Sequence, residues 1–167
     1  MCKDTYIAEL HAHFGPDKRR INHALKVLRF AEMIMEGEKV ADELRTIVTI
    51  TALLHDVGIK TAEEKYKSSA GRYQEIEGPP IAEEIMRRRD ESQAVMGRVA
   101  YIIGGHHTAA KNNGLDFQII WEADLLVNIA EDGLADGSDK LRGIIDRNFR
   151  TGTGKAIAYR EYLPPRE

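Results

Sequence analysis

The chain has 167 residues, of which 24 are Lys or Arg and 27 are Asp or Glu, a formal net charge of −3. This length favours one domain over residues 1–167, and the small net charge and absence of an apolar run of roughly 18 residues exclude nucleic acid polymers and membranes as general partners. Cys2 is the one cysteine, which excludes an internal disulfide, and no secretory signal pattern is present, so a reducing cytoplasm is expected.

Helical periodicity starts in the first third of the chain. Residues 17–36 carry apolar side chains at 3.6-residue spacing, and His23 lies on their inward side. Residues 42–55 are apolar around most of the helix, which predicts a central element packed on several sides. His55 and Asp56 would end it, and Gly58 is a predicted stop through a left-handed conformation.

Periodicity fades over residues 61–78, which predicts a long, polar, partly basic loop. Pro79 and Pro80 suit the first turn of a helix that runs to about Arg89. Further helices are expected over residues 91–104, 116–132, 137–149 and 152–162. The sequence therefore predicts an all-α bundle of roughly six to eight helices.

Four side chains in these helices are of metal-ligand type. His55 and Asp56 are adjacent, His23 lies 32 residues before His55, and Asp124 lies 68 residues after Asp56. Asp124 stands in an apolar helix, where a carboxylate must be paired or bound to a metal. Singly, such residues are more often capping carboxylates or hydrogen-bonded core histidines. As a set, two imidazoles and two carboxylates favour a divalent Mn, Fe, Co, Ni or Zn ion.

The order His, His-Asp, Asp, with Leu53-Leu54-His55-Asp56-Val57-Gly58 at its centre, resembles the HD-domain superfamily of metal-dependent phosphohydrolases. The resemblance covers residues 19–129 approximately and implies an HD-like helical bundle around a central metal site. It implies that His23, His55, Asp56 and Asp124 hold one ion, and that a metal-activated water attacks a phosphoester, with Asp56 as a catalytic residue. The implied substrate is a small phosphorylated metabolite, with nucleotides as a reasonable class.

Superfamily members with two metals are similar to one another in carrying two further histidines between the His-Asp pair and the last Asp. Gly105-His106-His107-Thr108 matches one of these places, whereas the nearest match to the other is Glu77. Glu77 and His107 are therefore candidate ligands of a possible second ion, and His107 is also a candidate catalytic residue. His106 is a further ligand candidate or a phosphate contact. A plain helix N-terminal acid is the alternative for Glu77.

Basic residues around the pair are candidates for phosphate binding. The segment His55-Asp56-Val57-Gly58 resembles the start of the pattern His-Asp-x-Gly-Lys of related hydrolases, but Ile59 stands where the lysine is expected and Lys60 follows it. Lys60 is therefore either a catalytic residue that stabilises phosphate or a solvated surface lysine. Ile59 also stands where the nucleotidase branch tends to carry glutamate, a departure from that branch. The other candidates, for which a solvated surface is the alternative, are Arg19, Arg20, Lys65, Lys67 and Arg72.

The leading hypothesis is therefore a cytoplasmic phosphohydrolase with one divalent transition metal ion, two being open, and a small phosphorylated substrate. Neither a nucleic acid polymer nor a membrane is expected as a partner, and a homodimer stays open. One alternative is a non-catalytic regulatory module that binds a nucleotide. Another is a di-iron oxygenase on the same scaffold, which needs Glu77 and His107 as ligands.

Overall fold

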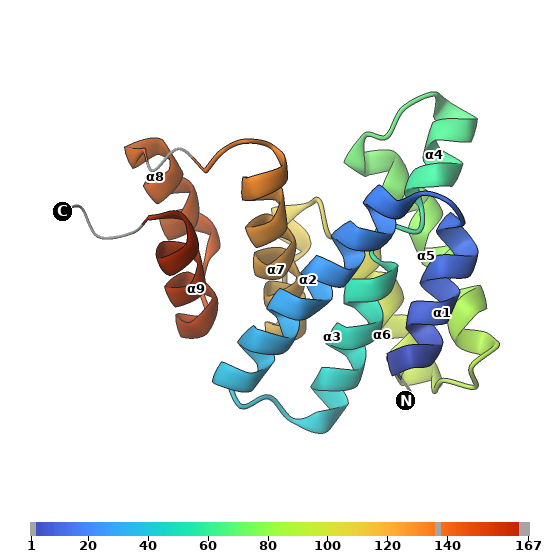
Figure 1. The fold of residues 1–167 in the computed structure, drawn as a ribbon. Helices are drawn as coiled ribbons and strands as arrows, with labels where there is room; N and C mark the ends of the chain where they lie inside the picture. The colour runs from blue at the N-terminus through green and yellow to red at the C-terminus, as the bar shows by residue number, and fades with distance from the viewer. Residues whose placement is uncertain (1–2, 136–137, 164–167) are drawn as a thin grey trace.

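The computed structural model describes residues 3–135 and 138–163, and within these residues every regular element is helical (Figure 1). The all-α prediction is confirmed, with nine α-helices and one short 3₁₀-helix in the described part of the chain. In chain order the elements are α1 (Lys3–Phe14), α2 (Lys18–Gly37), α3 (Asp42–Leu54), α4 (Ile59–Tyr66), α5 (Gly71–Arg87), α6 (Gln93–Ile103), η1 (Ala109–Lys111), α7 (Leu115–Glu131), α8 (Asp139–Asn148) and α9 (Gly152–Tyr162). None of these helices is long and apolar enough to cross a membrane.

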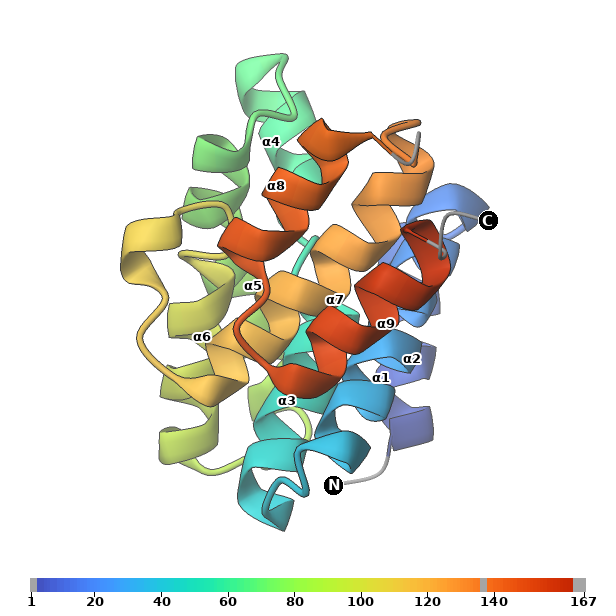
Figure 2. The same ribbon diagram turned by 90° about the vertical axis from the view of Figure 1, so that its left-hand side faces the viewer.

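Helices α2, α3 and α7 form the middle of the molecule, and each of them packs against the other two. α6 covers another side of α3, and α1 packs on α2 and α3. Figure 2, turned by 90°, shows α9 beside α7, where it also contacts α2. The central position of α3 explains its all-round apolar sequence, because residues 47–54 are all buried.

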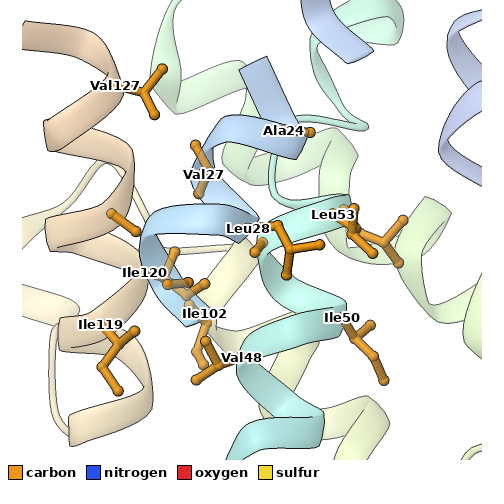
Figure 3. Packing of buried hydrophobic residues seen from close by; sticks show 14 of the residues in the cluster. Ala24, Val27, Leu28, Val48, Ile50, Leu53, Ile102, Ile119, Ile120 and Val127 are labelled. Atoms are coloured by element: carbon orange, nitrogen blue, oxygen red, sulfur yellow. The ribbon is translucent and has the colours of Figure 1, made fainter. Parts of the chain in front are cut away.

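The hydrophobic core lies where α2, α3, α6 and α7 meet (Figure 3). Its members include Val27 and Leu28 from α2, Val48 and Leu53 from α3, and Ile120 from α7, all almost completely buried. Burying one such side chain contributes roughly 1.5–3 kcal/mol. The three helices that carry or directly precede the predicted metal ligands thus pack against one another through this core.

The prediction of a long loop over residues 61–78 is wrong, because α4 and most of the first half of α5 occupy these residues. α4 was missed because Ala62 is its one buried residue, so no apolar stripe marks the helix. α5 begins at Gly71, and Pro79 and Pro80 lie inside it rather than in its first turn. A proline within a helix removes a backbone hydrogen bond, and here packing of α5 on α4 and α6 offsets that cost.

The prediction that Gly58 ends α3 is wrong, because α3 ends at Leu54 and Gly58 is the N-cap residue of α4. Its φ of −74° and ψ of −17° are right-handed, so no left-handed conformation is involved. A Cβ atom at this position would lie 2.5 Å from the backbone nitrogen of Gly78 and 2.7 Å from the carbonyl oxygen of Gln74. The glycine therefore permits a close backbone contact between the start of α4 and α5, two residues after Asp56.

The remaining boundaries agree closely with the predicted ranges. α2, α3, α6 and α7 begin and end within about two residues of their predictions, and α9 coincides with residues 152–162. α8 accounts for the helix predicted over residues 137–149, of which Gly137 lies outside the described residues. Cys2 also lies outside them.

An ion pair between Arg98 of α6 and Asp116 of α7 gives a test of this packing. Arg98 donates from Nε and Nη2 to the two carboxylate oxygens at 2.7 and 2.6 Å. Burial alone would raise the pKa of Asp116, but the Arg98 guanidinium outweighs it and lowers that pKa. We expect Arg98→Ala to lower the free energy of unfolding at neutral pH by about 2–3 kcal/mol. Urea denaturation measures this.

The pH dependence follows from the lowered pKa. Stability from a carboxylate with a depressed folded pKa is fully present above the unfolded value of about 3.9 and is lost as the pH falls through the folded pKa. The difference between wild type and Arg98→Ala should therefore shrink below about pH 4. Arg29→Ala, at an exposed position of α2, is the matched control and should change stability by less than about 0.5 kcal/mol. A difference that persists unchanged in acid would contradict the assignment.

Candidate metal centre

Three helices bring the four predicted metal ligands together. His23 lies in α2, His55 and Asp56 follow the end of α3, and Asp124 lies in α7. Nε2 of His23 is 3.1 Å from Oδ1 of Asp124, 3.3 Å from Nε2 of His55 and 3.6 Å from Oδ2 of Asp56. Nε2 of His55 is 3.4 Å from Oδ2 of Asp56 and 3.8 Å from Oδ1 of Asp124.

These separations fit a single divalent ion. Two ligand atoms about 2.1 Å from an ion, at a tetrahedral or octahedral angle, lie about 3.0–3.4 Å apart. Most of the observed distances fall in or close to this range, and His23, His55 and Asp56 alone offer three converging ligand atoms. The donor set therefore fits the metal that the sequence predicts.

Hydrogen bonds on the far sides of the rings orient the histidines. Nδ1 of His55 donates to the carbonyl oxygen of Ala52 at 2.9 Å. A carbonyl can only accept, so Nδ1 carries the proton and Nε2 of the neutral ring directs a lone pair toward the cluster. Nδ1 of His23 lies 3.0 Å from Oε2 of Glu131, an arrangement common behind metal-ligating histidines.

The electrostatics keep both carboxylates ionised despite their burial. Burial alone would raise the pKa values of Asp56 and Asp124, but the surrounding histidines outweigh it and lower both. Burial lowers the pKa of His55, which keeps that ring neutral. For His23, burial is opposed by the hydrogen bond to Asp124 and by the charge of Asp56, and the pKa rises to about 9.

A second group of ligand atoms adjoins the first. Asp56, His106 and His107 offer three atoms that could hold an ion. Nδ1 of His106 donates to the carbonyl oxygen of Ile103 at 2.7 Å, and its Nε2 lies 3.5 Å from Oδ1 of Asp56. Burial lowers the pKa of His106, but Asp56 outweighs it and raises that pKa. Desolvation and the neighbouring His106 lower the pKa of His107 to about 4.

The structure does not bring Glu77 into either group. Its carboxylate accepts hydrogen bonds from Nζ of Lys65 at 2.7 Å and from the Tyr66 hydroxyl at 2.9 Å. Gln74, one turn earlier in α5, lines the cavity at the metal cluster instead. Its Nε2 donates to the carbonyl oxygen of Ser69, while Oε1 is buried without a hydrogen-bond partner among the described residues.

Gln74 is a site residue that sequence reasoning missed. Nε2 of His106 is the other buried side-chain atom in the described residues without a hydrogen bond. Buried polar atoms are nearly always satisfied, so these two mark a place where a ligand is expected. Helical spacing could have indicated Gln74, because a helix that begins at Gly71 places Gln74 and Gly78 on the same face. Both residues approach Gly58, two residues after Asp56.

The cavity over the cluster has a volume of about 300 Å³. Six carboxylates and two arginines line it, so an anionic phosphate can enter favourably only after cations have offset the excess negative charge. Both lining arginines, Arg19 and Arg20, are among the predicted phosphate contacts. Arg20 is already paired, at 2.6 Å from Glu63 and 3.3 Å from Asp17. Arg19 has no ion pair or hydrogen-bonded side-chain partner among the described residues.

The other predicted cations do not line this cavity. Ile59 faces it in place of Lys60, whose charge acts instead on His13 of α1, where it lowers the pKa of a ring that burial already depresses. Lys65 binds Glu77, and Nζ of Lys67 donates to the carbonyl oxygen of Glu64 at 3.0 Å. The Arg72 guanidinium lies over the Tyr73 ring at 4.6 Å.

Comparison with known proteins gives two matches. A family model described as HD domain matches residues 20–143. The crystal structure of a predicted HD superfamily hydrolase from an uncultured Thermotogales bacterium is similar, with a TM-score of 0.69 and 20% sequence identity over 94% of this chain and 83% of that chain. This likeness shows the fold and confirms the predicted HD-like bundle. No protein of curated function matches the chain significantly.

Proposed function

The chain belongs to the HD domain family, whose members are generally metal-dependent hydrolases, and from that premise we propose that it hydrolyses a small phosphorylated metabolite. The observation that carries this proposal is the convergence of ligand atoms from His23, His55 and Asp56, with Oδ1 of Asp124 3.1 Å from Nε2 of His23 and 3.8 Å from Nε2 of His55. A nucleotide is the substrate class that we favour within it. The phosphate would enter the acidic cavity that opens over these ligands.

His23, His55, Asp56 and Asp124 would hold a divalent Mn, Fe, Co, Ni or Zn ion. When bound, such an ion lowers the pKa of a water molecule and neutralises charge on phosphoryl oxygens. The protein contributes rigid placement, since core helices carry His23 and Asp124, and His55 and Asp56 directly follow the buried end of α3. Asp56 also faces His106 through its other carboxylate oxygen, so one side chain connects the two groups of ligand atoms. His107 and Gln74 border the same space.

Arg19 is the residue that we expect to contact the substrate phosphate. It lines the cavity and is unpaired among the described residues, whereas Asp17 and Glu63 already neutralise Arg20. Hydrogen bonds between charged groups contribute about 1.5–3 kcal/mol, so Arg19→Ala should raise KM at least about tenfold and change kcat less. Steady-state kinetics on a hydrolysed phosphoester measure both constants.

The comparison needs matched variants. Arg19→Lys should recover part of the affinity, because it restores the charge but not the bidentate geometry. Arg29→Ala removes an exposed arginine farther along α2 and should leave both constants unchanged. An unaltered KM in Arg19→Ala would exclude Arg19 from phosphate binding.

The proposed activity is tested by two measurements on protein purified without chelator or nickel affinity resin. Plasma mass spectrometry gives the bound metal, and a panel of nucleoside monophosphates, sugar phosphates and phosphodiesters is then assayed for released phosphate or alcohol. We expect at least one ion per chain and metal-dependent hydrolysis that chelation abolishes and the same metal restores. Metal-loaded protein that binds a nucleotide and hydrolyses nothing would favour the regulatory alternative. Oxygen uptake would favour the oxygenase.

A further inference from the structure

A second cavity, of about 180 Å³, adjoins the metal cluster on the side of α7. It shares His107, Asp124 and Asn128 with the larger cavity, so the two meet at the ligands. Its other walls include Trp121, Leu125 and Asn148. His106, a predicted ligand candidate, also lines this cavity, whereas Trp121, Leu125 and Asn148 are not among the predicted site residues.

One side of α7 builds most of this cavity. Trp121, Asp124, Leu125 and Asn128 follow one another at spacings of three, one and three residues, which places them on one helix face. Nε1 of Trp121 donates to Oδ1 of Asn148 at 3.1 Å, which anchors the indole edge against the end of α8. The apolar walls of the cavity are therefore held in place beside a metal ligand.

Asn128 differs from the neighbouring amide side chains. Nδ2 of Asn148 donates to the carbonyl oxygen of Ile144 at 2.8 Å, and the amide group of Gln118 contacts Glu122. The Asn128 amide has no hydrogen-bond partner among the described residues, although it borders both cavities. Its donor and its acceptor therefore remain available to a ligand.

The volume indicates the size of that ligand. A cavity of roughly 150 Å³ is enough to bind benzene, so 180 Å³ accommodates a single ring. The side chains of Trp121 and Leu125 suit an apolar ring face, because flat ring systems stack on aromatic residues. Asn128 suits a polar ring edge.

We propose that this second cavity binds one ring of the substrate's leaving group, and that this ring has an apolar face and a hydrogen-bonding edge. The inference rests on the proposed function, in which the phosphate occupies the larger cavity. Hydrolysis breaks the bond between phosphorus and the leaving-group oxygen, water supplies the new oxygen of the phosphate, and the ring compound departs as its alcohol. The pyrimidine base of a departing nucleoside and the ring of a departing sugar both have this chemistry.

Trp121 is the only tryptophan of the chain, so its fluorescence reports directly on this cavity. Phosphonates are suitable probes because their phosphorus–carbon bond resists hydrolysis. We would titrate the metal-loaded protein with benzylphosphonate, pyridin-3-ylmethylphosphonate, propylphosphonate and inorganic phosphate. Both ring compounds should change the tryptophan emission and bind at least about fivefold more tightly than propylphosphonate. Inorganic phosphate should leave the emission unchanged.

Asn128→Ala adds a test of the polar edge. It should reduce the affinity for the pyridyl compound to that for the benzyl compound, and leave propylphosphonate binding as in the wild type. Asn113→Ala, which removes an exposed amide that contacts Arg98, is the matched control. Uridine 5′-monophosphate and ribose 5-phosphate then distinguish a base from a sugar. If the base occupies the cavity, only uridine 5′-monophosphate changes the tryptophan emission. If the sugar occupies it, ribose 5-phosphate changes the emission as well. If Asn128→Ala does not fold, the comparison of ring and propyl probes in the wild type still decides.

Equal affinity for benzylphosphonate and propylphosphonate, or ring binding without any change in emission, would overturn the proposal. Failure of the proposed function gives a different result. A protein that hydrolyses no phosphoester but shows the ring-dependent fluorescence change retains the ring-binding cavity and loses only the hydrolase assignment. A second result is equal hydrolysis of phosphoesters with and without a ring in the leaving group, with no change in tryptophan emission. This result would support the hydrolase assignment and exclude the ring-binding cavity.

Discussion

Asp56→Ala should abolish metal retention and lower kcat/KM for phosphoester hydrolysis by at least about a thousandfold, or about 4 kcal/mol of transition-state stabilisation. One oxygen of this carboxylate lies 3.4 and 3.6 Å from the Nε2 atoms of His55 and His23, and the other faces His106 at 3.5 Å. No other side chain in the described residues joins both groups of potential ligands. Metal content and steady-state kinetics, measured on the same preparation, check the two expectations.

Two further variants make this result specific. Asp42→Asn changes an exposed acid at the opposite end of α3 and should retain metal and activity. Glu77→Ala should also retain the metal, because Lys65 and Tyr66 hold this carboxylate in the structure. Full activity in a metal-free Asp56→Ala protein would refute the proposed chemistry. If the metal content of the Glu77→Ala variant fell, Glu77 would have to be counted as a metal ligand.

Gly58→Ala should lower the free energy of unfolding by about 1–3 kcal/mol and reduce kcat/KM by up to about a hundredfold. The new Cβ would lie 2.5 Å from the nitrogen of Gly78 and 2.7 Å from the oxygen of Gln74. Both are backbone atoms, so relief requires a shift of α4 relative to α5, which displaces Gln74 from the cavity that it lines together with Asp56. Urea denaturation and kinetics measure the two effects.

Gly97→Ala is the control for this substitution. Gly97 lies inside α6, and a Cβ atom there would meet nothing within 4 Å. Alanine is the better helix former by up to about 1 kcal/mol, so this variant should be equally or more stable and fully active. If Gly58→Ala matched Gly97→Ala in both measurements, the close contact of α4 with α5 would not matter for the site.

The elements that could be predicted from the sequence are those whose burial leaves a regular apolar pattern. α3 and α7 are buried on most sides, and α2 carries an apolar stripe, so the ends of these helices followed from their apolar patterns. The gathering of His23, His55, Asp56 and Asp124 needed in addition the resemblance to a known order of ligands. Spacing alone does not specify which helix faces meet.

Helix α1 was not predicted from the sequence, and the wrong predictions lie around Gly58 and in the segment after it. α4 buries only Ala62, and α5 contains two prolines, so neither shows the signals by which helices are recognised. A helix that starts at Pro79 makes Glu77 the nearest match to the second-metal ligand and leaves Gln74 within the predicted loop. The role of Gly58 depends on how closely two helices approach, which only the tertiary structure reveals.

Helix α4 buries only Ala62, so the part of the site that it forms is less constrained by packing than the metal ligands are. Metal binding and substrate selection therefore depend on different parts of the structure. The metal ligands lie on or beside helices that pack against one another in the hydrophobic core. In contrast, α4 packs mainly on α5, and Glu63 and Ser69 in this region line the cavity. Substitutions at the exposed positions among residues 59–69 thus change the cavity lining at little energetic cost, while substitutions around the ligands are constrained by the core. A lineage of such proteins can acquire new substrates by altering this one corner and keep the inherited metal chemistry intact.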